Sequence, residues 1–185
     1  MKRLLSLVLV AFILCGCDSG EKYIQRGLQL RERLLAQPCS FVANITADYG
    51  DKIYTFALGC TTDTDGNVSF IVIAPESIAG IAGSIKTENG YFYFDEAVLA
   101  FPLLADGEVS PISAPWLMIK SLRSGYLSSA GMDGDLLQLT LNDTYEADAL
   151  QVDVWLDETN IPRSADVLWQ GRSVLSLHIE DFTFE

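Results

Sequence analysis

The chain has 185 residues and a formal net charge of −13, from 12 basic and 25 acidic side chains. It contains neither a basic patch nor an alternation of basic and aromatic residues, and an acidic surface repels phosphate groups, which argues against nucleic acid as a partner. The length fits a single domain of ordinary size with a substantial core.

The first element is a short apolar segment of the kind found in secretory signals. Two basic residues precede an apolar run over 4–14, which is too short to span a bilayer because a spanning helix needs about 20 apolar residues. The sequence Leu-Cys-Gly-Cys, ending at Cys17, resembles a lipobox, where a peptidase cuts before a cysteine that becomes diacylated. We therefore expect residues 1–16 to be a lipoprotein signal peptide and Cys17 to be lipidated. The alternative is an ordinary signal peptide in which Cys15 and Cys17 have no role.

Cleavage would leave the protein anchored by acyl chains to the cell membrane, on its extracytoplasmic side. Residues 1–16 contain two basic residues and no acidic one, so their removal takes the net charge from −13 to −15. Residues 17–20 are then a short tether to one domain over 21–185. At its start, apolar residues recur at helical spacing over 21–37 and Pro38 ends the pattern. We interpret this segment as an amphipathic helix packed on a sheet rather than a helix on a membrane surface.

The segment 39–60 predicts a β-hairpin with one apolar face, because apolar and polar residues alternate on both sides of a turn. A turn at Tyr49-Gly50 places Cys39 directly opposite Cys60, where the two can form a disulfide in an oxidising compartment. A turn at Gly50-Asp51 keeps the same faces but makes the cysteines diagonal neighbours about 7–8 Å apart, beyond disulfide reach. We predict the disulfide between Cys39 and Cys60, which would fix the first register.

Further alternating runs predict strands over 68–74, 82–88, 91–94 and 97–103, with a turn at Asn89-Gly90. A passage rich in proline follows. Helical periodicity then extends over 113–130 and Gly131 closes it. Four more strands are predicted over 135–141, 150–156, 163–169 and 173–184.

The order of these elements resembles the LolA/LolB and LppX-like family of bacterial envelope lipoprotein carriers over nearly the whole mature chain. The resemblance also rests on the Phe41-x-Ala43 strand, a Pro-Glu-Ser break at Pro75, the aromatic strand 91–94 and the closing segment 181–184. It implies an α+β fold, in which two or three helices cover an antiparallel, incompletely closed β-barrel of about nine to eleven strands. In that family the barrel holds acyl chains in an apolar cavity. This chain departs from the soluble carriers by having its own lipobox.

We expect a groove between the concave face of the sheet and the helix around 116–127, because two helices cannot fill so wide an interior. It would bind an acyl chain, a lipid or a lipoprotein. The alternative is an envelope sensor or scaffold that binds a protein partner. A continuous apolar cavity would distinguish the carrier from the scaffold, whose interior can be filled with side chains. The expected groove residues are Phe41, Ile45, Tyr54, Phe56, Leu58, Phe70, Phe92, Phe94, Trp116, Ile119 and Val154.

No pattern typical of an enzyme or a metal site is present in the sequence. His178, the single histidine, alternates with apolar residues on the predicted polar face of a strand, and no nucleophile motif accompanies it. Asp63, Asp65 and Gly66 fit a hairpin turn better than an EF-hand loop, which needs a distal glutamate. The cysteines and the distant histidine do not match any zinc-site spacing. We therefore expect a non-enzymatic protein without a cofactor or metal.

Overall fold

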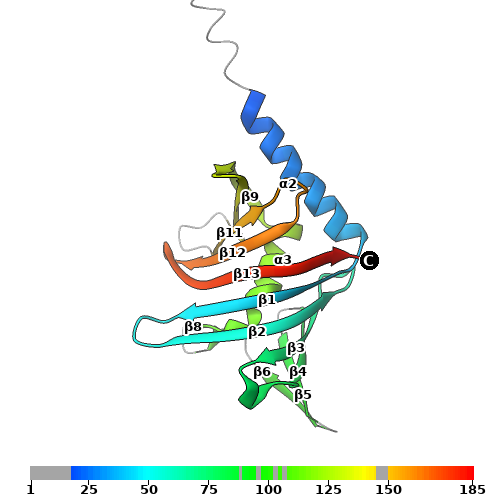
Figure 1. Ribbon diagram of the computed structural model, residues 1–185, viewed down its shortest axis with the longest axis vertical. Helices are drawn as coiled ribbons and strands as arrows, with labels where there is room; N and C mark the ends of the chain where they lie inside the picture. Colours follow the sequence, from blue (N-terminus) through cyan, green and yellow to red (C-terminus); the bar gives the residue numbers. More distant parts are fainter. Residues whose placement is uncertain (1–17, 88, 95–96, 102–103, 106–107, 145–149) are drawn as a thin grey trace, which may run out of the picture.

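A computed structural model describes residues 18–185, except for 88, 95–96, 102–103, 106–107 and 145–149. Within these residues the chain forms an antiparallel sheet of 11 strands, two α-helices and a separate two-stranded sheet (Figure 1). The large sheet is open, because its end strands β6 (Ala97–Phe101) and β9 (Tyr126–Asp133) do not pair with each other. The predicted fold class, an incompletely closed antiparallel barrel with covering helices, is confirmed.

Hairpins connect most neighbouring strands, as the alternation of apolar and polar residues predicts. The order across the large sheet is β6-β5-β4-β3-β2-β1-β13-β12-β11-β10-β9. Its other strands are β1 (Cys39–Asp48), β2 (Ile53–Thr62), β3 (Val68–Ala74), β4 (Ala82–Lys86), β5 (Asn89–Phe94), β10 (Leu136–Asn142), β11 (Gln151–Leu156), β12 (Pro162–Trp169) and β13 (Arg172–Phe184). A short 3-10 turn, η1 (Glu76–Ile78), lies between β3 and β4. After β6 the chain forms β7 (Leu104–Ala105), β8 (Glu108–Val109) and a second 3-10 turn, η2 (Pro111–Ser113).

The strands β1–β6 form one half of the sheet and β9–β13 form the other. The two halves meet at β1 and β13, which pair antiparallel in the middle of the sheet. Phe41 on β1 stacks against Phe182 on β13, with ring centroids 5.4 Å apart. The backbone N–H of Glu185 also donates a hydrogen bond to the carbonyl of Pro38, at 3.1 Å. The end of the chain is therefore fixed beside the start of the first strand.

The helix α3 (Ala114–Ser124) packs against one face of the sheet, which we call the inner face. In Figure 1 this helix lies behind β1 and β13, so the view is onto the opposite, outer face. Trp116, Met118, Ile119 and Leu122 of α3 are all buried, and they join the inward side chains of the strands in one core. Apolar residues on several sides of α3 explain why it is enclosed rather than laid on the surface.

The helix α2 (Asp18–Ala36) packs against α3 and β9, and the prediction that this helix covers the sheet is confirmed. Leu30 and Leu34 are buried. Gly27 permits close approach, because a Cβ atom there would lie 3.2 Å from Cδ1 of Leu139. The apolar stripe of α2 therefore contributes to the core.

The arginines of α2 contact other elements of the same chain. Arg31 donates hydrogen bonds to the carbonyls of Leu122 (2.8 Å) and Gly125 (2.6 Å) at the end of α3. Arg26 donates to the Asn160 side chain (2.6 Å) in the turn between β11 and β12. The guanidinium of Arg33 lies over a phenylalanine ring of β13, 3.9 Å from its centroid. These contacts hold α2 against the domain.

Two predicted boundaries are wrong. The second helix ends at Ser124 rather than at Ala130, because Gly125 leaves the helical conformation (φ −66°, ψ 161°) and the following residues form β9. Close packing also fixes this position, since a Cβ atom at Gly125 would lie 2.6 Å from the Ser121 carbonyl oxygen. Likewise, Asn89 and Gly90 belong to β5 and pair with β4, so they do not form the predicted turn.

Candidate binding surfaces

Most of the residues expected to line a groove lie in the closed core. Seven of the eleven have exposed fractions of only 0 to 6%, which leaves no open surface at these side chains. The reason is α3, which occupies the inner face and packs its own apolar side chains against those of the strands. The seven residues are Phe41, Ile45, Leu58, Phe70, Trp116, Ile119 and Val154.

The other expected groove residues lie nearer the surface. Phe56 and Phe92 are partly buried against the core, and Tyr54 is 44% exposed. The side chain of Phe94 lies outside the described part of the chain. Phe92 packs against Phe101, with ring centroids 4.5 Å apart. On the inner face it also neighbours Leu99, which is 56% exposed, so the apolar lining reaches the surface at β5 and β6.

The predicted disulfide is wrong, because Cys39 and Cys60 are both free. The strands β1 and β2 pair in the second of the two registers considered, which places Cys39 opposite Thr62 and Cys60 opposite Phe41. The cysteines are therefore diagonal neighbours on the inner face. The backbone N–H of Cys39 donates to the Thr62 hydroxyl at 3.0 Å, and its thiol lies 3.2 Å from the same oxygen.

Burial makes both thiols poor nucleophiles. Burial raises the pKa of Cys60, and the neighbouring Cys39 raises it further. Burial also raises the pKa of Cys39, although the hydrogen bond with Thr62 partly opposes this effect. Because the thiolate is the reactive form, both cysteines are core residues rather than chemical groups of a site.

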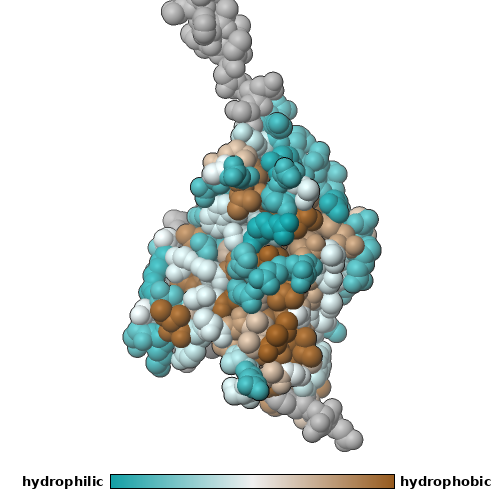
Figure 2. Space-filling view, in the orientation of Figure 1, coloured by the Kyte–Doolittle hydropathy of each residue, from teal (hydrophilic) through white to brown (hydrophobic). Residues whose placement is uncertain are grey.

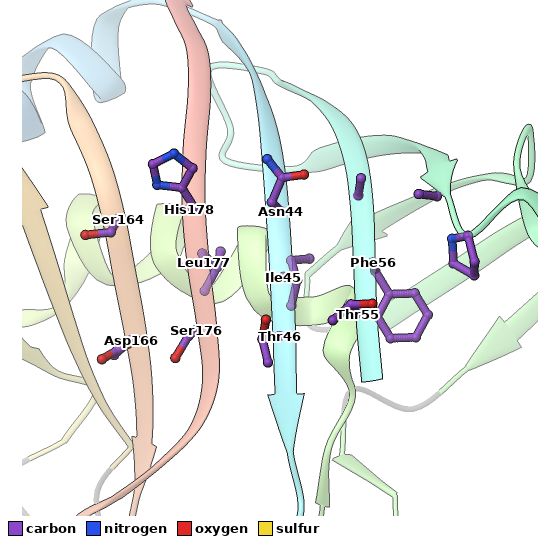
Figure 3. Close-up of a pocket in the computed structure, with 13 residues that line it drawn as sticks. Asn44, Ile45, Thr46, Thr55, Phe56, Ser164, Asp166, Ser176, Leu177 and His178 are labelled. Atoms are coloured by element: carbon purple, nitrogen blue, oxygen red, sulfur yellow. The ribbon is translucent and has the colours of Figure 1, made fainter. Parts of the chain in front are cut away.

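A pocket of about 680 Å³, lined by both polar and apolar residues, lies on the outer face, across β12, β13, β1 and β2. Figure 3 shows its polar side chains in two rows in front of α3. Strand register aligns Ser164, His178 and Asn44 in the first row. The second row contains Asp166, Ser176, Thr46 and Thr55.

The side chains of this outer pocket do not form a catalytic arrangement within the described chain. His178 is 67% exposed, and its Nε2 lies 3.7 Å from a carboxylate oxygen of Glu180. No hydrogen bond links His178 to the serine hydroxyls beside it in the described residues. The described residues also contain no group of three potential metal ligands from His, Cys, Asp and Glu. The polar side chains of the two rows therefore form a solvated part of the outer face.

A second pocket of about 580 Å³ lies between the end of α2, α3 and the turn between β2 and β3. Its cationic groups are engaged by the protein itself. Lys120 Nζ lies 4.9 Å from the centroid of the Trp116 ring. Arg123 donates hydrogen bonds to the carbonyls of Leu34 and Thr64, which joins both helices to the turn.

The same turn is ordered by Asp63, whose carboxylate accepts hydrogen bonds from the backbone and side chain of Asn67 at 2.9 and 2.7 Å. Burial acts to raise the pKa of Asp63, but these hydrogen bonds outweigh it and hold that pKa below its usual value. Gly66 has φ +87°, which suits the turn predicted at this position. This pocket therefore belongs to the structural contacts between the helices and the sheet.

An apolar row, which the sequence analysis did not identify, crosses the outer face. Strand register places one residue from each of six neighbouring strands side by side, and Ile71 (48%), Tyr93 (41%) and Val98 (58%) are exposed. Figure 2 shows a hydrophobic patch over β3 on this face. We call this set the outer row: Val42, Gly59, Ile71, Ala82, Tyr93 and Val98.

The predicted lipidation site, Cys17, lies outside the described residues. In the part of the chain that is described, neither helix combines the length and the apolar character needed to cross a membrane.

No family model matches the sequence, and no curated protein matches it either. Solved structures do align with the chain. An uncharacterized conserved protein from Thermus thermophilus aligns over 88% of this chain and 87% of its own, with 12% identity and a TM-score of 0.48. A DUF1329 family protein from Desulfovibrio piger aligns over 88% and 93%, with 11% identity and a TM-score of 0.47.

A LolA superfamily protein from Nitrosomonas europaea aligns over 86% of this chain and 93% of its own, with 13% identity and a TM-score of 0.45. This is the superfamily that the sequence resembles, and the open barrel with covering helices implied by that resemblance is the architecture of the chain.

Proposed function

We propose that this protein is a non-enzymatic, lipid-anchored envelope protein that binds a protein partner on the outside of its sheet. The filled interior carries the proposal. Seven of the expected groove residues are buried, and α3 occupies the space in which a carrier would hold an acyl chain. A small-molecule site needs a concave pocket that encloses much of its ligand, whereas a scaffold can be filled with side chains.

Two features support the anchored location and the protein partner. Cys17 follows a signal with the spacing of a lipobox, and the helix α2 begins at the next residue, Asp18. The outer row exposes large apolar side chains, including Ile71 on β3 and Tyr93 on β5, on either side of Ala82 on β4. Contiguous exposed apolar surface on a soluble domain marks sites of interaction.

A second candidate function is the binding of an acyl chain, lipid or lipoprotein at β5 and β6. One observation favours it: the inner apolar lining reaches the surface there, through the half-buried Phe92 and the exposed Leu99. An acyl chain at this position could enter the core only if α3 moved away from the sheet, because Trp116 and Ile119 are buried.

Native mass spectrometry of the domain purified without its anchor separates the two functions. The proposed function predicts the mass of the polypeptide alone and no saturable binding of a hydrophobic fluorescent probe. Lipid that copurifies in a fixed ratio would support the second candidate instead. In that case Leu99→Asp should remove the lipid, whereas Ile24→Asp, at an exposed position of α2, should retain it.

Crosslinking in cells tests directly whether a partner protein contacts the outer row. A photoreactive residue at position 71, on the outer row, should yield a protein adduct of defined mass. The same residue at position 29, on the exposed side of α2, serves as the control. An adduct at position 29 and none at position 71 would place the partner elsewhere and contradict the proposal.

A further inference from the structure

The two end strands of the sheet differ in how they are protected. β9 lies against α2 and contains a charged residue, Asp133. β6 has the sequence Ala-Val-Leu-Ala-Phe, without a charge, lysine or proline. Proteins usually protect an edge strand with charges, proline, bulges or a covering element, because its free N–H and C=O groups can pair with another chain. β6 lacks the protective residues that would prevent such pairing.

β6 is also exposed on both faces. Val98 points to the outer face and is 58% exposed, and Leu99 points to the inner face and is 56% exposed. Among the described strands, β6 pairs with β5 alone, since β7 and β8 form their own sheet. Within the described residues, no strand pairs with the side of β6 that faces away from β5, so that edge can form backbone hydrogen bonds with another chain.

The outer row leads to this same edge. Val98 on β6 lies beside Tyr93 on β5, followed by Ala82 on β4 and Ile71 on β3. A strand added next to β6 would place one of its outward residues directly beside Val98. It would thereby extend an apolar surface that already crosses the neighbouring strands.

We propose that β6 accepts an extended segment of the partner protein as a twelfth strand of the sheet, by β-augmentation. The segment carries apolar residues beside Val98 and Leu99, and basic residues at its flanks. Backbone hydrogen bonds supply affinity, and the two exposed side chains select the apolar residues. This inference rests on the proposed function, in which the partner is a protein.

The net charge of the mature chain favours a basic segment as the occupant. The mature chain has 15 more acidic than basic side chains, so its field attracts a basic partner and repels a second copy of itself. Charge therefore favours a different, basic protein over a second copy of this chain.

The test uses the acylated full chain in nanodiscs and a phage-displayed library of random peptides of about twelve residues. Selected peptides are then synthesised and their affinities measured by fluorescence anisotropy. We expect the enriched peptides to alternate β-branched residues between basic flanks. Hydrogen exchange at the β6 amides that point away from β5 should slow at least tenfold in the complex. A peptide with its basic residues replaced by glutamate should bind at least tenfold more weakly.

Variants locate the site. Val98→Lys and Leu99→Lys place charges on the edge strand and should each weaken binding at least tenfold. Ile53→Lys is the matched control, since Ile53 is 65% exposed on β2, four strands away, and should leave the affinity within twofold. Circular dichroism checks that each variant is folded.

Other outcomes overturn the inference and can be separated from failure of the proposed function. If selected peptides bind but protect another surface, or if Leu99→Lys binds them as well as the unchanged protein, β6 is not the docking strand while a protein partner remains. If no peptide is enriched, the inference fails. If lipid also copurifies with the domain, the proposed function fails as well.

Discussion

Cys39 and Cys60 project from adjacent strands into the core, where Thr62 accepts the N–H of Cys39 and the thiol of Cys60 lies 3.8 Å from the Leu58 carbonyl oxygen. Both side chains are almost fully buried, with exposed fractions of 0 and 2%. Their environment resembles that of small apolar residues more than that of reactive thiols.

Thiol labelling distinguishes buried free cysteines from a disulfide. The folded mature protein should not react with a thiol reagent at neutral pH, because burial raises the pKa of both cysteines and excludes the reagent. In denaturant without reductant, both should react completely. Peptide mapping by mass spectrometry assigns the label to Cys39 and Cys60. A requirement for reductant would show that the bond exists after all.

The helix α3 determines what the interior can hold. Its buried side chains, among them Met118 and Ile119, take up the inner face that a ligand would need. A packed core helix and a mobile lid differ in how much free energy their contacts contribute to folding. The difference can be measured in one variant.

Ile119→Ala should lower the free energy of unfolding by about 2–5 kcal/mol, because it leaves a cavity at a position with no exposure. Ile24→Ala is the control. It removes the same atoms from a side chain that is 42% exposed on α2 and should change stability by about 0.5 kcal/mol or less. Urea denaturation gives both values from the transition midpoints. A loss below about 1 kcal/mol at Ile119 would indicate a loosely held α3 and would revive the carrier hypothesis.

Alternation in the sequence was sufficient to predict which residues of the hairpin face inward. Phe41, Ile45 and Leu58 all lie on the buried face, as expected. The register was not predictable, because turns at Tyr49-Gly50 and Gly50-Asp51 keep the same faces and differ by two residues in pairing. The disulfide prediction depended on that choice and failed with it.

The second helix was predicted too long for a related reason. Tyr126 and Leu127 continue the apolar spacing of α3, so periodicity alone does not reveal that Gly125 ends the helix and that β9 begins. The outer row was missed because each of its residues comes from a different strand, as Ile71 and Val98 illustrate. Only the register of several hairpins brings such residues together.

The anchor remains a prediction from the sequence. Cys17→Ser should abolish acylation and move the protein to the soluble or secreted fraction, because the acyl chains are its expected attachment to the membrane. Cys15→Ser is the matched control, since it changes the other cysteine of the same motif and should leave the protein in the membrane fraction. Metabolic labelling with a fatty-acid analogue, followed by fractionation, measures both effects. A processed Cys17→Ser protein that stayed in the membrane would contradict the lipoprotein assignment.

The position of α2 determines how far from the membrane surface a partner protein could bind. Its 19 residues extend over about 28 Å and begin immediately after Cys17. The first part of α2 projects beyond the sheet, and β6 lies at the opposite end of the domain (Figure 1). With acyl chains inserted in the bilayer, α2 would act as a rigid spacer, and the β6 edge would lie on the side of the domain away from the lipid surface. A membrane protein could then reach β6 only with a long extracytoplasmic tail, and a tail shortened step by step should lose contact abruptly at one length.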